Sequence, residues 1–330
     1  MRLVTFVDSQ GLQRAGALIE QDTAVVDLQA AYTAAHGAAH PGLASVLALV
    51  EAGEAGLAAA RDAIQRASGA AVLPRASVKL RAPIQPPPQM RDFSCFETHL
   101  RQSFAAARRT RAAAAPTPEA AEKVLASTGP DDRVIDTFKR QPIYYKCNRF
   151  AVVGADDDMV WPSYSKAMDF ELEFGCYIAK PAKDVPREQA RDYIFGYTIF
   201  NDFSARDAQA REMPGMLGPA KSKDFDTANV MGPCLVTADE LPDPYNLTMI
   251  ARVNGEEWGR GNSSTMHWKF EDLIAHLSRS ETIHPGEFLG TGTVGNGCGL
   301  EIGRFLKPGD VVELEVQGIG VLRTRVTKPD

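Results

Sequence analysis

The sequence has few cysteines and no arrangement of them that suggests a structural role. Its five cysteines, in 330 residues, are scattered and include no Cys-x-x-Cys pair. This argues against a disulfide framework and against a thiolate zinc site, so a reduced, cytoplasmic location is expected. No apolar run reaches about 18 residues, so no membrane span is expected. The start of the chain, Met1 to Asp8, does not read as a signal peptide.

The sequence also has fewer basic than acidic residues, with 36 Lys and Arg against 42 Asp and Glu. The formal net charge is −6 and the sequence pI is about 5.6. Nucleic-acid binders more often have a basic face, so nucleic acid is not expected as a partner. The hydrophobic content of 44% and the charged content of 24% are ordinary for a globular protein. The length predicts about two domains.

The character of the chain changes at the Pro-rich segment 83–88. Short strands followed by an Ala- and Leu-rich helical stretch precede it, which predicts a small N-terminal β-rich domain with helix over residues 1–82. The larger domain, 83–330, becomes β-rich from residue 141. Strands are expected at 150–154, 168–179, 194–202, 231–237, 247–254 and 310–327, and helices near 186–192 and 269–279. This pattern predicts an α+β, β-rich fold rather than a regular strand–helix alternation.

Residues 100–126 are rich in alanine and arginine and contain a Pro-Thr-Pro break at 116–118. A pair of surface helices or a mobile excursion would account for this composition. The functional alternative is a lid over an active site.

The segment from Met168 to Phe174 alternates between apolar and acidic residues. In a strand, this alternation places three acids on one face, about 7 Å apart: Asp169, Glu171 and Glu173. The segment has no basic residue on that face, so either water or a cation must offset the repulsion. Hard cations such as Mg²⁺, Mn²⁺ or Ca²⁺ prefer such oxygen ligands, and the spacing alone leaves both alternatives open.

Asp202 and His99 are two further candidate functional residues. Asp202 lies at the end of an apolar strand, where it could either ligate a metal or, like Ser204, cap the following helix. His99 follows the Pro-rich segment closely. Histidine has a pKa suited to a general base, although a lone histidine is more often structural.

Five ordered motifs run through most of residues 88–327, and together they resemble the fumarylacetoacetate hydrolase family. They are Asp92-Phe93 followed by His99; Asp169-Phe170-Glu171-Leu172-Glu173; Asn201-Asp202-Phe203-Ser204-Ala205-Arg206-Asp207 with Gln209; Lys223-Asp224-Phe225-Asp226-Thr227; and Gly292-Thr293-Val294-Gly295 leading to Gly299-Leu300-Glu301. Each motif is short, but their order and spacing are specific.

The resemblance implies roles for individual residues. It implies a divalent cation, Mg²⁺ or else Mn²⁺ or Ca²⁺, held by four ligands: Asp92, Glu171, Glu173 and Asp202. Asp169 is then a supporting acid. The implied catalytic residues are His99 as general base, Glu301 as the acid that orients it, and Lys223. The implied substrate-binding residues are Tyr145, Arg206, Gln209, Thr293 and Arg108.

The resemblance also implies a fold and an activity. The fold is a mixed β-sandwich roll preceded by a small N-terminal β domain, and the expected assembly is a homodimer. The activity is hydrolysis of a C–C bond in a β-diketo acid or acylpyruvate, in the catabolism of aromatic or keto acids. The alternatives are a decarboxylase, hydratase or isomerase of a related 2-keto acid, or a non-catalytic member. Ser94 and Met213 replace two tyrosines of the fumarylacetoacetate-cleaving enzymes, which argues against fumarylacetoacetate as the substrate.

Overall fold

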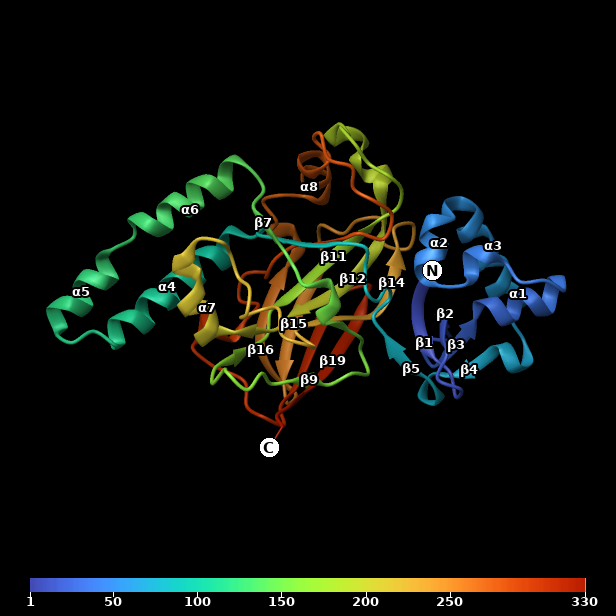
Figure 1. The fold of residues 1–330 in the computed structure, drawn as a ribbon, viewed down its shortest axis with the longest axis horizontal. Helices are drawn as coiled ribbons and strands as arrows, with labels where there is room; N and C mark the ends of the chain where they lie inside the picture. The colour runs from blue at the N-terminus through green and yellow to red at the C-terminus, as the bar shows by residue number, and fades with distance from the viewer. Residues whose placement is uncertain (330) are drawn as a thin grey trace.

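A computed structural model gives the fold and describes residues 1–329 (Figure 1). The N-terminal part contains, in chain order, β1 (Arg2–Val7), β2 (Gln13–Ile19), β3 (Ala24–Asp27), α1 (Leu28–His36), α2 (Val46–Glu51), α3 (Gly53–Arg66), β4 (Val72–Pro74) and β5 (Lys79–Arg81). Asp27 caps α1, because its carboxylate accepts a hydrogen bond from the backbone N–H of Ala30. Gly37 ends the helix in the left-handed conformation, which glycine adopts without strain.

The remainder of the chain is dominated by strands. Its elements are β6 (Met90–Phe93), α4 (Glu97–Ala113), α5 (Pro118–Ala126), α6 (Gly129–Arg140), β7 (Tyr144–Lys146), β8 (Val152–Val153), β9 (Met159–Val160), β10 (Met168–Asp169), β11 (Leu172–Ile178), β12 (Ile194–Asp202), β13 (Ser204–Ala205), α7 (Arg206–Glu212), β14 (Asn229–Thr237), β15 (Thr248–Val253), β16 (Glu256–Asn262), α8 (Phe270–Leu277), β17 (Phe288–Gly290), α9 (Gly299–Ile302), β18 (Val311–Val316) and β19 (Gly320–Thr327). The predicted α+β, β-rich class is confirmed. Every helix within residues 1–329 is too short or too polar to span a bilayer.

One sheet runs through both parts of the chain. Its strands are ordered β4-β3-β2-β1-β14-β12-β11-β17-β6-β7, with β5 paired to β1 and β8 paired to β14. The antiparallel pairing of β1 with β14 places Arg2 opposite Val236 and joins the two parts. The expected domains, 1–82 and 83–330, therefore share a sheet. The boundary between them stays a prediction, and Asp330 lies outside the described residues.

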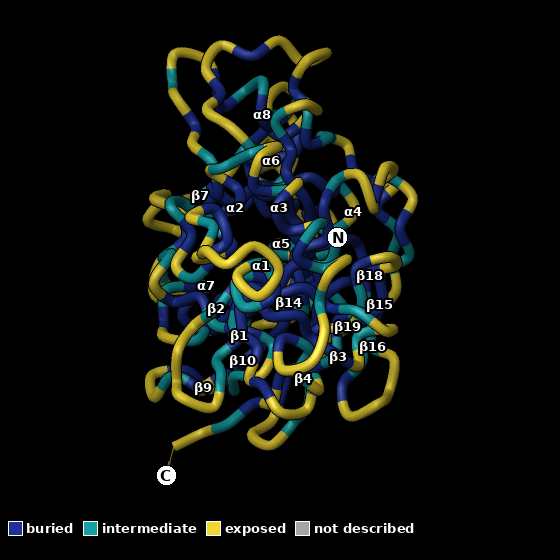
Figure 2. The backbone as a smooth tube through the Cα atoms, turned by 90° about the vertical axis from the view of Figure 1, so that its right-hand side faces the viewer, coloured by how far each residue is buried: buried dark blue, intermediate teal, exposed yellow. Residues whose placement is uncertain are grey.

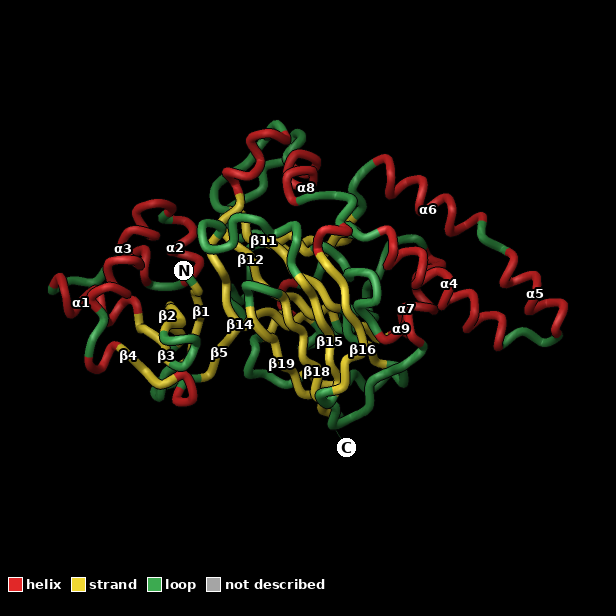
Figure 3. Tube along the Cα trace, turned by 180° about the vertical axis from the view of Figure 1, so that it is seen from behind, coloured by secondary structure: helices red, strands yellow, loops and turns green. Residues whose placement is uncertain are grey.

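A second sheet, ordered β16-β15-β18-β19-β9, packs against the first. Ile199 of β12, Met249 of β15 and Leu314 of β18 belong to one buried apolar cluster between the two layers. The strands of both layers lie together in the centre of the molecule (Figure 3), where the backbone is mostly buried (Figure 2). Every residue of β12 is buried, as expected for an apolar strand that is covered on both faces.

Helices α4, α5 and α6 form an arm, residues 97–140. It extends from the central sheets on the side opposite the N-terminal part (Figures 1 and 3). An apolar cluster that includes Leu100, Ile135 and Phe138 fixes its base. The surface helices predicted within residues 100–126 are present as α4 and α5. The lid function stays a prediction.

Four predicted elements differ from the structure. Residues 150–154, expected as one strand, are a 3-10 helix over Arg149–Ala151 and the two-residue strand β8. The segment 168–179 is two strands, because β10 pairs with β13 whereas β11 pairs with β12. Its three acids are at most 5% exposed, so the alternative of a solvated face is wrong. Residues 310–327 form a hairpin, β18 and β19, rather than one strand. The helix expected at 186–192 is a 3-10 helix over Arg187–Tyr193.

Replacing Phe270 with alanine should destabilise the protein strongly. Phe270 of α8 is fully buried against the rings of Phe174 and Tyr197, with ring centroids 5.3 and 5.6 Å away. A cavity of this size costs about 3–5 kcal/mol of the free energy of unfolding, which urea denaturation measures. Leu125→Ala, at a position on the arm that is 48% exposed, should change this free energy little. Equal effects of the two substitutions would contradict this packing.

Candidate metal centre and active site

Neighbouring strands of the large sheet bring acidic residues to one place, where the ends of these strands meet. We call this place the acidic edge. The start of β11 lies beside the end of β12, with Glu173 opposite Phe200 in an antiparallel register. The parallel pair β17 and β6 ends at the same edge, with Gly290 opposite Asp92. Asp202 is the last residue of β12. The edge therefore collects carboxylates from three strands that are far apart in the sequence.

Three of these carboxylates form a buried cluster. Asp92, Glu173 and Asp202 each offer an oxygen, and the three oxygens lie within 4.8 Å of one another. Within these carboxylates, Oε2 of Glu173 and Oδ1 of Asp202 are buried and have no hydrogen-bond partner. Unpartnered buried carboxylate oxygens are costly, and a hard divalent cation would satisfy them. The donor set therefore fits the predicted Mg²⁺ or Mn²⁺.

Burial makes these acids difficult to ionise. Desolvation, together with the charge of Asp202, raises the pKa of Asp92 to about 7. Desolvation also raises the pKa of Asp202 to about 6, although Lys223 opposes it. Burial and the nearby Asp92 raise the pKa of Glu173 well above its ordinary range. Carboxylates ligate metals when deprotonated, so a bound cation would replace the protons that these groups otherwise retain.

Glu171 has different partners. Its carboxylate pairs with the Lys223 ammonium and lies 2.8 Å from Nη2 of Arg206. Burial acts to raise the pKa of Glu171, but Lys223 and Arg206 outweigh it and hold the pKa below its ordinary value. Lys223 also pairs with Asp202, so its ammonium links Glu171 to the three-carboxylate cluster. The role of Glu171 as a metal ligand stays a prediction.

Asp169 lies outside the cluster and supports its surroundings. Its carboxylate accepts hydrogen bonds from Nε of Arg206 at 2.8 Å and from the backbone N–H groups of Gly299 and Leu300 at 2.8 and 2.9 Å. These bonds fix the start of α9, which carries Glu301. The geometry agrees with a supporting acid.

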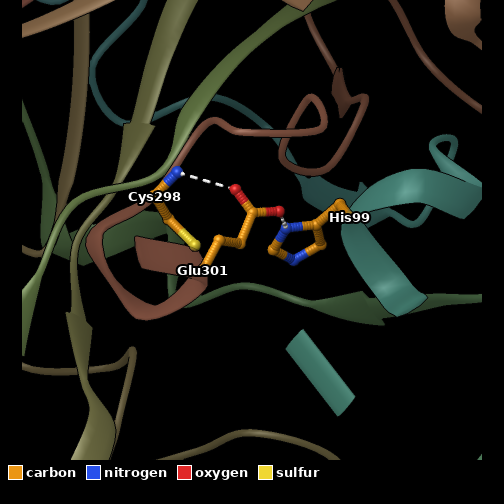
Figure 4. Close-up of side chains that lie close together, drawn as sticks. All are labelled: His99, Cys298 and Glu301. Carbon is orange, nitrogen blue, oxygen red and sulfur yellow. Dashed lines mark hydrogen bonds and ion pairs between the residues drawn. The ribbon is translucent and has the colours of Figure 1, made fainter. Parts of the chain in front are cut away.

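His99 of α4 and Glu301 of α9 meet next to this edge (Figure 4). Nδ1 of His99 lies 2.9 Å from Oε1 of Glu301, and the backbone N–H of Cys298 donates to Oε2 of Glu301 at 3.3 Å. When Nδ1 carries the proton toward Glu301, Nε2 is left to accept one. An isolated backbone bridge between Cys298 and Glu171 joins this pair to the acidic edge.

Other predicted site residues contact the same carboxylates. The Tyr145 hydroxyl donates to Oδ2 of Asp202 at 2.7 Å, and the Thr293 hydroxyl donates to Oε1 of Glu173 at 3.3 Å. Gln209 accepts a hydrogen bond from Arg206 at 3.0 Å. The structure thus brings all predicted ligands and all but one of the predicted substrate-binding residues to one place.

Arg108 is the exception. Its guanidinium pairs with Asp131 of α6, so it is engaged within the arm, and its role in substrate binding stays a prediction. The neighbouring Arg109 instead reaches the backbone carbonyl of Glu301, at 3.5 Å. The capping alternative for Asp202 and Ser204 is wrong, because α7 begins without a side-chain cap.

The sequence matches a known family along about two thirds of its length. Residues 110–327 match the family described as "Fumarylacetoacetate (FAA) hydrolase C-terminal". The chain belongs to the fumarylacetoacetate hydrolase family. An uncharacterized protein of Staphylococcus epidermidis is 41% identical over 165 residues, which are 50% of this chain and 54% of that protein. One of Staphylococcus aureus is 39% identical over 162 residues, 49% of this chain and 53% of that protein. The matches span about half the length of these relatives.

Solved structures of the family share the fold over the whole chain. Maleylpyruvate hydrolase from Sphingobium sp. SYK-6 and fumarylacetoacetate hydrolase from Exiguobacterium antarcticum each have a TM-score of 0.72 at 22% identity. A probable 2-hydroxyhepta-2,4-diene-1,7-dioate isomerase from Mycobacterium abscessus has a TM-score of 0.70 at 23% identity. Each comparison covers 100% of both chains. The expected fumarylacetoacetate hydrolase-like fold is confirmed.

Sequence reasoning missed the contribution of Cys298. It precedes Glu301 by three residues and caps α9, with its side chain accepting from the N–H of Glu301 while Glu301 accepts from its own N–H. This reciprocal arrangement is a capping box, which usually has serine or threonine in the first position. The Cys-x-x-Glu spacing was the available signal.

Metal binding should stabilise this family member more as the pH rises. In the metal-free protein, the raised pKa values of Asp92 and Asp202 give stability that is full below the ordinary carboxyl pKa. That stability is lost as the pH rises through about 6 to 7. A bound cation removes the dependence on these protons. The rise in Tm caused by Mg²⁺, relative to EDTA, should therefore grow between about pH 5 and pH 8. A pH-independent rise would contradict this account of the cluster.

Gly290→Ala should weaken metal binding more than it weakens the fold. A methyl group at this position would lie 2.5 Å from Oδ1 of Asp92 and would displace the carboxylate. Displacement of a ligand or its support typically costs about tenfold or more in metal affinity, which isothermal titration calorimetry with Mn²⁺ measures. Gly129→Ala, where the methyl group meets open space, is the matched control. If Gly290→Ala binds Mn²⁺ normally, Asp92 is not a ligand.

Proposed function

We propose that the protein hydrolyses a C–C bond in a β-diketo acid or acylpyruvate, in the catabolism of aromatic or keto acids, with a divalent cation. The observation that supports this most directly is the His99–Glu301 pair beside the buried carboxylate cluster. It combines a proton acceptor with a cation site, and hydrolysis of a β-diketone needs both. A structural neighbour, the Sphingobium maleylpyruvate hydrolase, has been solved with manganese(II) and pyruvate.

The cation would be held by Asp92, Glu173 and Asp202, with Glu171 as the predicted fourth ligand. When bound, Mg²⁺ or Mn²⁺ supplies Lewis acidity toward the oxygens of the keto acid. Thr293 and Tyr145 donate hydrogen bonds to Glu173 and Asp202 and so hold two of the carboxylates in place.

The protein's own residues carry the proton transfers. His99, oriented by Glu301, takes a proton from water as the water oxygen adds to the carbonyl carbon. Lys223 and Gln209 stabilise the negative charge that develops on the carbonyl oxygen. The C–C bond then breaks, its electron pair passes to the departing enolate, and the proton on His99 returns to the enolate carbon. The products are a carboxylic acid and a ketone, so that one water is consumed for each bond broken.

A second reaction class within the family is the alternative. A decarboxylase, hydratase or isomerase of a related 2-keto acid would use the same enolate chemistry. The likeness to a probable isomerase supports keeping it, and so do Ser94 and Met213, which replace tyrosines expected in a fumarylacetoacetate-cleaving enzyme. We also propose that the protein acts on a small keto acid as a homodimer in the cytoplasm.

A screen of keto acids tests the activity. Acylpyruvates and oxaloacetate are incubated with Mg²⁺, with Mn²⁺ or with EDTA, and products are identified by mass spectrometry. We expect acylpyruvates to give pyruvate and a carboxylic acid, with loss of turnover in EDTA. Carbon dioxide from oxaloacetate, a hydrated product or an isomerised product in place of cleavage would favour the alternative instead.

His99→Ala should reduce kcat by about 10²–10⁴-fold, because general base catalysis contributes that much. Mg²⁺ affinity should be unchanged, since His99 is not among the carboxylate ligands. The exposed His284 provides the control substitution, His284→Ala, which should keep full activity. Full turnover by His99→Ala on every cleaved substrate would remove His99 as the base.

A further inference from the structure

We propose that His99, Cys298 and Glu301 form a second cation site, which takes a thiophilic divalent metal such as Zn²⁺ and blocks the His99–Glu301 pair. One ligand atom from each residue lies within 4.8 Å of the other two. In Figure 4 the Glu301 side chain lies between His99 and Cys298, with the Cys298 sulfur beside its aliphatic part. The cluster is separate from the all-oxygen cluster of Asp92, Glu173 and Asp202.

The spacing suits tetrahedral zinc after a small adjustment. Zinc binds nitrogen and oxygen at about 2.0–2.2 Å and sulfur at about 2.3 Å, so tetrahedral ligand atoms lie about 3.5 Å apart. Nδ1 of His99 and Oε1 of Glu301 are already 2.9 Å apart, and the Cys298 sulfur lies within 4.8 Å of a ligand atom of each. The hydroxyl of Ser103, 3.4 Å from Nδ1 of His99, or a water would complete four-fold coordination.

The cluster is held in place from several directions. Cys298 caps α9 and shares a capping box with Glu301. Asp169 anchors the N–H groups of Gly299 and Leu300, which lie between them. The backbone that carries Cys298 and Glu301 is therefore held in place, and metal binding would need adjustment of the side chains alone.

Ligand chemistry separates the two sites. Thiolate with imidazole and carboxylate selects zinc and similar borderline metals, whereas clustered carboxylates suit Mg²⁺ and Mn²⁺. The two sites would therefore hold different cations at the same time. The His99 side chain is 14% exposed and that of Glu301 is 2% exposed, so His99 lies on the side from which a cation would enter.

Zinc in this site would remove the proton acceptor. It would coordinate a ring nitrogen of His99 and the carboxylate that orients the ring. The thiol proton of Cys298 would leave to solvent as the thiolate binds. Inhibition should therefore persist when the oxygen site is saturated with Mg²⁺. This consequence rests on the proposed function, whereas the binding itself does not.

Cobalt(II) tests the binding without any assay of activity. The protein is saturated with Mg²⁺ and titrated with Co²⁺, and a thiolate-to-cobalt charge-transfer band is sought in the near-ultraviolet. We expect the band in the wild type and its loss in Cys298→Ser. The control, Cys234→Ser, should retain it, because Cys234 is buried in β14 with its sulfur 3.7 Å from the carbonyl of Ile319. Absence of the band in the wild type, or its persistence in Cys298→Ser, overturns the proposal.

Zinc inhibition tests the consequence. In excess Mg²⁺, the zinc concentration that halves the rate should rise at least about tenfold in Cys298→Ser, with each variant compared with its own zinc-free rate. Serine keeps the cap on α9, and normal Mg²⁺ affinity shows that the variant has folded. Cys298→Ala serves as the second variant if serine itself retains zinc. Equal inhibition of the wild type and both variants would place the inhibitory zinc elsewhere and overturn the proposal. A protein that shows the cobalt band but cleaves no keto acid would contradict the proposed function alone.

Discussion

The site depends on the mutual repulsion of carboxylates that the fold removes from water. Asp92, Glu173 and Asp202 are buried at one edge of a sheet that brings them within 4.8 Å. Like charges at this distance in a poorly polarisable interior favour protonation or a cation. Two buried cations, Lys223 and Arg206, compensate Glu171 and Asp169 but leave oxygens of the cluster without partners. The residual negative charge is what a divalent metal would balance.

The acidic edge and the His99–Glu301 pair are mechanically connected. Asp169 binds Arg206 on one side and the start of α9 on the other. Because α9 carries Glu301, the orientation of the proton acceptor depends on the same buried network that neutralises Glu171. A change at Asp169 would therefore alter both the charge balance and the position of Glu301. The predicted cation site and the predicted base are therefore structurally linked through Asp169.

The sequence predicted the main parts of the site because they depend on short, ordered motifs. Alternation alone left Asp169, Glu171 and Glu173 ambiguous, and only the distant Asp92 and Asp202 favoured a metal. The break between β10 and β11 could not be read from the alternation, because the pattern is uninterrupted while the hydrogen-bonding partners change from β13 to β12.

Arg108 shows a different limit of sequence reasoning. Adjacent residues on a helix point about 100° apart, so the phase of α4 decides whether Arg108 or Arg109 faces Glu301. The ion pair with Asp131 comes from α6, a partner that no local pattern could indicate. Contacts between side chains of separate helices depend on packing that single motifs do not encode.

The separation of the carboxylate cluster from the His99–Glu301 pair fits a family with several reactions. When bound, the cation would polarise a keto acid and stabilise its enolate, and hydrolysis, decarboxylation and isomerisation would all use that stabilisation. These reactions would differ in the group that meets the enolate or its neighbouring carbonyl, and in the proposed reaction that group, the His99–Glu301 pair, comes from α4 and α9, outside the cluster. Ser94 follows Asp92 by two residues and Met213 follows Asp202 by eleven, and neither is among the predicted ligands. The charge constraint therefore acts on the carboxylates of the cluster, and in the proposed function the residues around the cluster would set the substrate preference.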